Sequence, residues 1–253
     1  MATARIIPCL LLKGNGFYKT ARFRHPVYLG DPINILRIFN DKEADEIFIL
    51  DISATSSSRE PNIELLRDLA SECFMPLGYG GGIRSIEQMA TLFQTGFEKV
   101  SLNTSAHERP ELVSAAARRF GSQSVVVSID VKKTPFGGWQ AMTHGGTRSS
   151  GRDPVEFARD MEDRGAGEIL LNSIDRDGTM RGYDLPLIKA VAGAVGIPVI
   201  ACGGAGNVRD LASAFITGGA SAAAAGSFFV FQGPHRAVLI SMPSQTELRA
   251  CLS

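Results

Sequence analysis

The amino-acid sequence repeats itself at a nearly constant offset of about 122 residues. DEIFILD in the first half resembles GEILLNS in the second, and Gly81-Gly82 in GYGGGIRS matches Gly203-Gly204 in ACGGAGNV, each at an offset of 122. SLNTSA and AAGSFF correspond at an offset of 123. An accidental likeness would not keep its offset over three segments, so the chain is expected to consist of two similar halves, about residues 1–122 and 123–253.

Short apolar runs rich in β-branched residues alternate along the chain with longer segments of helical period. Capping residues mark several helix starts, as in Asp31-Pro32 and Asp153-Pro154, and Pro61 and Ser85 open two more. Glycine turns in QTGFEKV, DRGAGEIL and AVGIPVI are typical of helix ends. Strands are expected to begin near Arg5, Glu46, Pro76, Lys99, Val125, Glu168, Pro198 and Ala222.

Eight strand-helix units in 253 residues predict an α/β fold, a single (β/α)8 TIM barrel over residues 1–253. Runs that are apolar on both faces favour parallel strands covered by helices. A doubly wound sheet is the alternative. Even spacing of the units, and the lack of a glycine-rich fingerprint after the first strand, favour the barrel built from two half-barrels.

Composition excludes several classes of partner. Lys+Arg and Asp+Glu balance at 26 each, which gives no reason to expect nucleic acid as the main partner. The four cysteines lack metal-ligand spacing, so we expect packing roles for them, no metal and no cofactor. The apolar run Ile6 to Leu12 is too short for a membrane span and lacks a signal-peptide cleavage site. A cytoplasmic protein with no membrane association is expected.

Glycines and small polar residues follow the predicted strands in both halves. At the carboxyl ends of barrel strands, where chemistry takes place in this fold, backbone N–H groups of such residues can hold phosphate. Glycines that only form tight turns are the alternative. Two such sets predict a ligand with a phosphate at each end. The first set is Gly80 to Gly82, Asn103 and Thr104, and the second is Asp177, Gly178, Gly203, Gly204, Gly226 and Ser227.

Asp130 ends the predicted fifth strand, in VVVSIDVKK, and is expected to point into the barrel mouth between the phosphate sites. A carboxyl group there is a candidate general acid or base. Alternatively, Asp130 orders the loop at Lys132. In the corresponding stretch RIIPCLLLK, matching Lys13 with Lys132, an offset of 119, places Leu11 opposite Asp130. The basic residues after it, Lys13, Lys19, Arg22, Arg24 and His25, form either a lid over an anionic ligand or a solvated face.

Four charged residues stand at the amino-terminal starts of predicted strands. Two are positive and two negative, and they are expected to ring the barrel floor. Such a cluster usually contributes to stability alone. Four charges directed at one axis favour a closable opening instead. The residues are Arg5, Glu46, Lys99 and Glu168.

The chain resembles the HisF family, the cyclase subunits of imidazole glycerol phosphate synthase, from ARIIPCL to GSFFVF. GSQSVVVSIDVK, RGAGEILLNSIDRDGT and SLNTSA carry the resemblance. It implies that a HisH-type glutaminase docks on the barrel floor and that ammonia passes the charged ring to react with a bis-phosphorylated aminoimidazole carboxamide ribotide. The resemblance carries catalysis onto Asp130 and Lys19, the ammonia gate onto Arg5, Glu46, Lys99 and Glu168, and phosphate binding onto Gly82, Asn103, Thr104, Asp177, Gly178, Gly204 and Ser227.

The resemblance breaks at Leu11. The family pattern Cys-Leu-Asp-Val-Lys supplies a second catalytic carboxylate, whereas this chain has CLLLK. PCLLLK and the following KT are similar to HisF-like proteins of surface-polysaccharide loci, the WbuZ type. That likeness implies a glutaminase, a third amidotransferase protein and an acetamido sugar converted to an amidine. A working histidine-pathway cyclase with a substitute acid, and a non-catalytic ammonia conduit and binding module, remain open.

Overall fold

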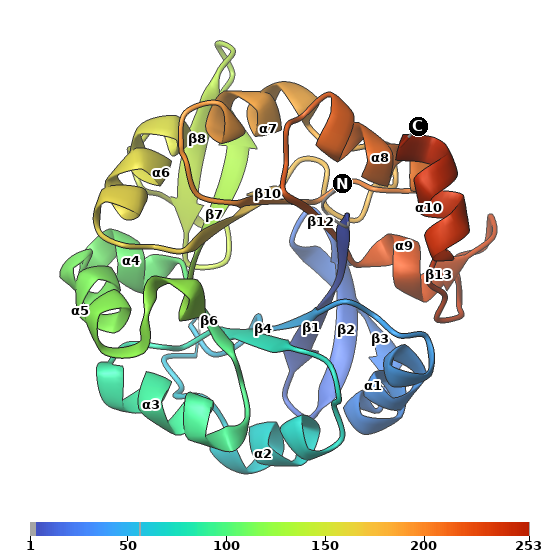
Figure 1. The fold of residues 1–253 in the computed structure, drawn as a ribbon, viewed down its shortest axis with the longest axis horizontal. Helices are drawn as coiled ribbons and strands as arrows, with labels where there is room; N and C mark the ends of the chain where they lie inside the picture. The colour runs from blue at the N-terminus through green and yellow to red at the C-terminus, as the bar shows by residue number, and fades with distance from the viewer. Residues whose placement is uncertain (1–3, 56, 253) are drawn as a thin grey trace.

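A closed barrel of parallel strands surrounded by helices makes up the computed structural model, which describes residues 4–55 and 57–252 (Figure 1). Each barrel strand pairs in parallel with the next one, and the ring closes where β12 pairs with β1. This confirms the predicted (β/α)8 barrel. The division into half-barrels near residue 122 stays a prediction. The barrel strands are β1 (Arg5–Lys13), β4 (Ile47–Asp51), β5 (Leu77–Gly80), β6 (Lys99–Leu102), β7 (Val125–Lys133), β10 (Glu168–Ser173), β11 (Val199–Cys202) and β12 (Ala222–Ala225).

Helices begin where capping residues predicted them, with small shifts. Asp31, Ser85 and Asp153 each accept a hydrogen bond from a backbone N–H of the first helical turn. The helix expected at Pro61 begins at Ile63, capped by Asn62. The helices are α1 (Pro32–Asp41), α2 (Ile63–Ser71), α3 (Ile86–Thr95), α4 (Thr104–Glu108), α5 (Glu111–Phe120), α6 (Pro154–Asp163), α7 (Leu185–Ala192), α8 (Val208–Ile216), α9 (Ser227–Val230) and α10 (Gln245–Leu252), with a 3-10 turn at Ser122–Ser124.

Helix ends follow the glycine signals less closely. Gly96 caps α3 with φ +114°, a conformation that favours glycine. The helix before AVGIPVI ends earlier than its glycine, because α7 stops at Ala192 with Gly193 as its cap. Among the described residues, no helix combines the length and the apolar character needed to cross a membrane.

Two separate apolar layers hold the barrel together. Along a strand the buried side chains alternate between them, as Ile47 and Ile49 pack under the helices while Phe48 joins the layer inside the barrel. The inner layer is small, with Phe48 packed tightly against Gly78. All four cysteines are free thiols, of which Cys9 and Cys202 belong to this inner layer.

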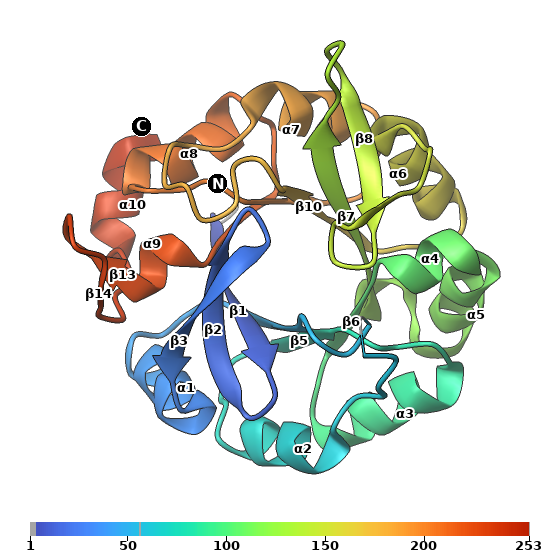
Figure 2. The same cartoon turned by 180° about the vertical axis from the view of Figure 1, so that it is seen from behind.

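Three hairpins extend the barrel at its carboxyl end. β2 (Gly16–Ala21) and β3 (Arg24–Gly30) continue from β1, where a basic loop was expected. β8 (Trp139–Thr143) and β9 (Arg148–Ser149) continue from β7, and the small β13 (Phe231–Gln232) and β14 (Ala237–Val238) follow α9. Figure 2 shows the first two hairpins in front of the barrel opening.

Candidate functional site

A cavity of about 940 Å³ opens at the carboxyl ends of the barrel strands. Both sets of glycine loops line it, together with the residue pair that the repeat places opposite each other, Leu11 and Asp130. A volume of this size accommodates a phosphorylated sugar or nucleotide-like ligand. All the predicted catalytic and phosphate-binding residues border this one space: Leu11, Lys19, Gly82, Asn103, Thr104, Asp130, Asp177, Gly178, Gly204, Gly226 and Ser227.

The glycines of the two loops hold backbone conformations that other residues resist. Gly82 has φ +71° and Gly204 has φ +126°. A Cβ atom on Gly204 would lie 2.2 Å from the carbonyl oxygen of Gly182, and one on Gly82 would lie 2.7 Å from that of Arg59. Close backbone packing therefore requires glycine at both positions. The phosphate-binding role of these loops stays a prediction.

Asn103 and Thr104 organise the first-half side of the cavity. The Asn103 side-chain amide donates hydrogen bonds to the Ser128 carbonyl at 3.1 Å and to Asp130 Oδ2 at 3.2 Å. Thr104 Oγ1 accepts from the backbone N–H of His144 at 3.0 Å. Asn103 thus positions the candidate acid, while the Thr104 hydroxyl borders the cavity.

Lys19 and Asp177 form a buried ion pair across the second half of the cavity. The Lys19 Nζ to Asp177 Oδ1 distance is 2.7 Å, and the Thr20 hydroxyl donates to Asp177 Oδ2 at 3.2 Å. The Asp177 backbone N–H donates a hydrogen bond within its own turn, to the Ser173 carbonyl at 2.9 Å. Asp177 therefore holds the β2–β3 hairpin over the cavity, and Arg22 adds a backbone hydrogen bond to the Asp177 carbonyl at 2.9 Å.

The basic run after β1 divides between its two predicted roles. Lys19 is buried and covers the cavity, as a lid residue would. Lys13 at the end of β1, Arg22 in the turn, and Arg24 and His25 on β3 are exposed to solvent.

Asp130 and Leu11 stand in contrasting environments within the cavity. Asp130 pairs in register with Asn172 on β10, whereas Leu11 pairs with Leu50 on β4. Burial, reinforced by the charge of Asp177, raises the pKa of Asp130 to about 7. One half thus offers a carboxyl group that can exchange a proton near neutral pH, and the other offers two leucines.

The raised pKa of Asp130 predicts a pH-dependent stability. Between about pH 4 and pH 7 the folded chain binds this proton more tightly than the unfolded chain, so Asp130 costs stability as pH rises through about 7. Relative to the wild type, Asp130→Asn should gain roughly 2–4 kcal/mol of unfolding free energy from about pH 4 to pH 8. Urea denaturation across that range measures the difference. If the unfolding free energies of the two proteins changed in parallel with pH, the raised pKa of Asp130 would be contradicted.

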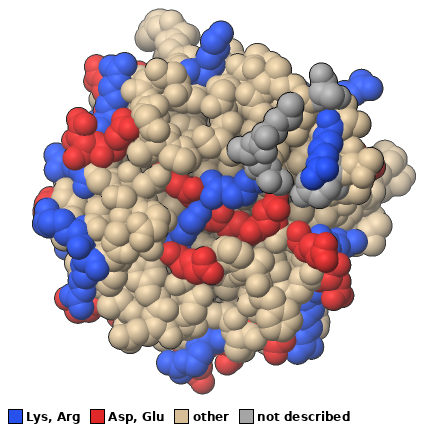
Figure 3. All heavy atoms as spheres, viewed as in Figure 1, with Lys and Arg blue, Asp and Glu red and all other residues tan. Residues whose placement is uncertain are grey.

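The four predicted floor residues form a closed ring of ion pairs at the opposite end. Arg5 contacts Glu46 at 3.1 Å and Glu168 at 2.6 Å, and Lys99 contacts the same two carboxylates at 2.9 and 2.8 Å. Figure 3 shows basic and acidic atoms gathered at the middle of this face. Burial raises the pKa of Glu46, while the charges of Lys99 and Arg5 oppose that rise. The prediction that the four charges meet at the barrel floor is confirmed; their role as a gate stays a prediction.

Arg236, an exposed residue that contacts the cavity wall from outside, is one that the sequence patterns did not single out. Its guanidinium donates to the Gly178 carbonyl and the Ser227 hydroxyl, both at the cavity wall. Arg236 lies nine residues after Ser227, on the turn between β13 and β14. No periodic pattern reaches it, because the repeat ends near GSFFVF.

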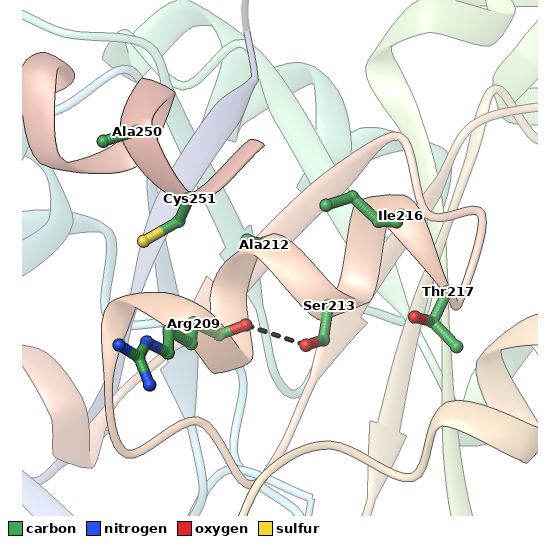
Figure 4. Close-up of a pocket in the computed structure, with 7 residues that line it drawn as sticks. All are labelled: Arg209, Ala212, Ser213, Ile216, Thr217, Ala250 and Cys251. Carbon is green, nitrogen blue, oxygen red and sulfur yellow. Dashed lines mark hydrogen bonds between the residues drawn. The ribbon is translucent and has the colours of Figure 1, made fainter. Parts of the chain in front are cut away.

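A second hollow, of about 340 Å³, lies outside the barrel between α8 and α10 (Figure 4). It is lined by Arg209, Ser213 and Ile216 among others, and by no residue predicted to be functional. Within the described residues, His, Cys, Asp and Glu side chains form no group of three or more able to hold a metal ion. The barrel mouth is therefore the candidate active site.

Comparison with known proteins agrees with this architecture. The family model described as "Histidine biosynthesis protein" matches residues 5–235. A Pseudomonas aeruginosa protein, provisionally named imidazole glycerol phosphate synthase subunit hisF2, is 52% identical over 248 residues, covering 98% of this chain and 99% of that protein. The imidazole glycerol phosphate synthase subunit HisF of Hyphomonas neptunium is 48% identical over 231 residues, 91% of each chain. With its barrel, its repeat and these relatives, the chain belongs to the HisF family of histidine biosynthesis proteins.

Proposed function

We propose that the chain is the synthase subunit of a glutamine amidotransferase whose ammonia forms an amidine on a surface-glycan sugar. Ammonia comes from a HisH-type glutaminase docked at the amino-terminal face of the barrel. It crosses the charged ring and the barrel interior and is used at the mouth, with a third amidotransferase protein as a further partner. A phosphorylated small molecule binds the two glycine-loop sites, and the complex works in the cytoplasm.

The route along the barrel axis supports this proposal. Behind the ring of Arg5, Glu46, Lys99 and Glu168 lies an apolar layer that includes Ile7, Val126 and Ala224. Neutral ammonia crosses such a layer far more readily than ammonium, which would lose its hydration. The charged ring at the entrance can remove a proton before the apolar layer is reached. Ammonia would then reach the cavity that holds Asp130.

Leu11 is the observation that carries the choice of chemistry. Ring closure of the bis-phosphorylated ribotide needs protons moved at two places, and Leu11 can move none. Asp51 and Asp177, the other aspartates that line the cavity, already accept hydrogen bonds from backbone or side-chain donors. Removing one of two acid-base groups costs about 10²–10⁴-fold in rate. A subunit that delivers ammonia to another acceptor does not need the second carboxyl group.

A working cyclase of histidine biosynthesis is the second candidate. The pKa of Asp130, raised to about 7, suits general acid-base catalysis at neutral pH. Both glycine loops also contain glycines with positive φ, which bring the backbone close to the cavity. A third candidate, a conduit and binding module without chemistry of its own, is consistent with the same residues, since neither ammonia passage nor ligand binding needs Leu11 to be acidic.

Turnover of the bis-phosphorylated aminoimidazole carboxamide ribotide by the wild-type chain separates these candidates. Excess ammonium salt at alkaline pH supplies free ammonia and removes the need for a glutaminase. We expect no imidazole glycerol phosphate above the level without enzyme. Formation of that product at a rate typical of enzymes, roughly 1 s⁻¹ or more, would overturn the proposal and establish the cyclase. Stimulation of a HisH-type glutaminase on mixing tests the partner separately.

A further inference from the structure

The guanidinium of Arg236 lies directly behind the wall of the cavity. Its Nη2 atom donates to the Gly178 carbonyl oxygen at 3.2 Å and to Ser227 Oγ at 3.3 Å. Gly178 and Ser227 both line the cavity at the predicted second phosphate site. The Arg236 guanidinium carbon also lies 4.7 Å from the centre of the Phe231 ring, which fixes its orientation.

Arg236 supplies a positive charge at this site that no carboxylate balances. Lys19, a second cation there, is already paired with Asp177 at 2.7 Å. In the described part of the chain Arg236 forms no salt bridge, and the neighbouring Arg176 directs its guanidinium to the Arg181 carbonyl instead. An anion at the second-half loops would therefore meet Arg236, whose charge no carboxylate neutralises and whose guanidinium already contacts Gly178 and Ser227.

Ser227 is prepared by the same contact to donate to an anion. A hydroxyl group has one hydrogen to donate and two lone pairs to accept with. Because Ser227 Oγ accepts from Arg236, its own hydrogen remains available to the cavity, and the adjacent positive charge strengthens it as a donor. Ser227 is buried, with 4% of the residue exposed, so water competes little for this hydrogen.

We propose that Arg236 is a phosphate-binding residue of the second-half site, and that it acts through its charge and through the orientation of Ser227. The ligand class is a phosphate monoester, such as one end of a phosphorylated sugar or ribotide. This inference rests on the phosphate-binding part of the proposed function and adds to it a residue outside the repeat. Loss of one charge-assisted contact is expected to weaken phosphate binding about 10- to 100-fold.

Calorimetric titration of the full chain with inorganic phosphate tests this assignment. The wild type should show two sites. Arg236→Ala should weaken one of them about 10- to 100-fold, and Thr104→Val should weaken the other. Arg236→Lys keeps the positive charge but lacks the planar guanidinium, so its phosphate affinity should lie between those of the wild type and Arg236→Ala. Arg209→Ala, which removes an exposed arginine from α8, is the matched control and should bind as the wild type does.

A double-variant comparison separates binding through Ser227 from a merely structural role. If Arg236 acts partly through the hydroxyl, Arg236→Ala and Ser227→Ala together should weaken binding less than the product of their separate effects. Equal urea midpoints for wild type and Arg236→Lys check that folding is intact. Unchanged phosphate affinity in Arg236→Ala would overturn the inference and leave phosphate binding standing. If the wild type binds no inorganic phosphate, both this inference and the phosphate-binding part of the proposed function are wrong. Ammonia transfer would still be tested separately, by the glutaminase and turnover assays.

Discussion

Leu11→Asp should give the chain ammonia-dependent formation of imidazole glycerol phosphate, about 10²–10⁴-fold above the wild type. Leu11 lines the same cavity as Asp130, so an aspartate there would place a second carboxyl group across the bound ribotide. The measurement is product formation from the bis-phosphorylated ribotide with excess ammonium salt at alkaline pH, where a buried carboxyl group is ionised most fully.

The surroundings of Leu11 suggest a sharper version of this experiment. Asp130 has Asn172 beside it in register, but Leu11 has Leu50. A carboxylate buried beside a leucine costs stability and is held in its protonated form. The double variant Leu11→Asp, Leu50→Asn reproduces the polar pair of the second half and should be the more active of the two. Leu11→Asn is the matched control, since asparagine has the shape of aspartate but no carboxyl group that could exchange a proton.

Three outcomes have different meanings. Activity of Leu11→Asp without activity of Leu11→Asn would identify proton transfer as the function lost at this position. Equal activity of both variants would contradict that reasoning and indicate that Leu11 only blocks the ligand sterically. Absence of product with every variant would mean that the β2–β3 hairpin, held down by Lys19 and Asp177, excludes the ribotide.

The barrel could be predicted from sequence because its signals are local and repeated. Strand starts such as Arg5, Val125 and Glu168 agree with the structure, and others differ by one residue. Each barrel strand pairs with its neighbour along the chain, so finding the strands and their order was sufficient. The charged ring was predictable for the same reason, since residues at strand starts must converge at one end of the barrel.

The hairpins at the mouth could not be predicted in the same way. Lys19 belongs to a strand only because β2 finds a partner edge in β1, and its ion pair with Asp177 joins residues 158 positions apart. The Arg236 contact similarly depends on where the β13–β14 turn folds back. Such contacts depend on tertiary packing that periodicity does not encode.

Lys99→Met should lower the free energy of unfolding by about 3–5 kcal/mol near neutral pH. Lys99 Nζ contacts both Glu46 and Glu168, whose side chains are 3% and 9% exposed. Removing it leaves two buried carboxylates that share one cation, Arg5, and an unpaired buried charge costs more than the pair contributed. Urea denaturation measures the loss. Arg37→Met, which breaks an exposed ion pair with Glu72 on the outer helices, is the matched control and should change little.

The stability deficit of Lys99→Met relative to the wild type should shrink as the solution is acidified. Burial already raises the pKa of Glu46, and Lys99 opposes that rise, so removing Lys99 should raise the pKa further. A carboxyl group with a raised folded-state pKa loses stability as pH increases through that pKa. The deficit of Lys99→Met should therefore be smaller near pH 5 than near pH 8. A deficit independent of pH would show that lost packing, rather than an unpaired carboxylate, destabilises the variant.

Replacing all four ring residues together distinguishes a gate from a stabilising cluster. Apolar residues of similar volume often equal or exceed a buried ion-pair network in stability. The combined variant Arg5→Leu, Glu46→Leu, Lys99→Leu and Glu168→Leu should thus be more stable than Lys99→Met. If the ring admits ammonia, this variant in a Leu11→Asp background should lose glutamine-dependent product with a HisH-type glutaminase and keep ammonium-dependent product. The ammonium-dependent activity is the internal control, because ammonia supplied in bulk reaches the mouth without crossing the floor. Equal retention of both activities would mean that the ring serves stability alone.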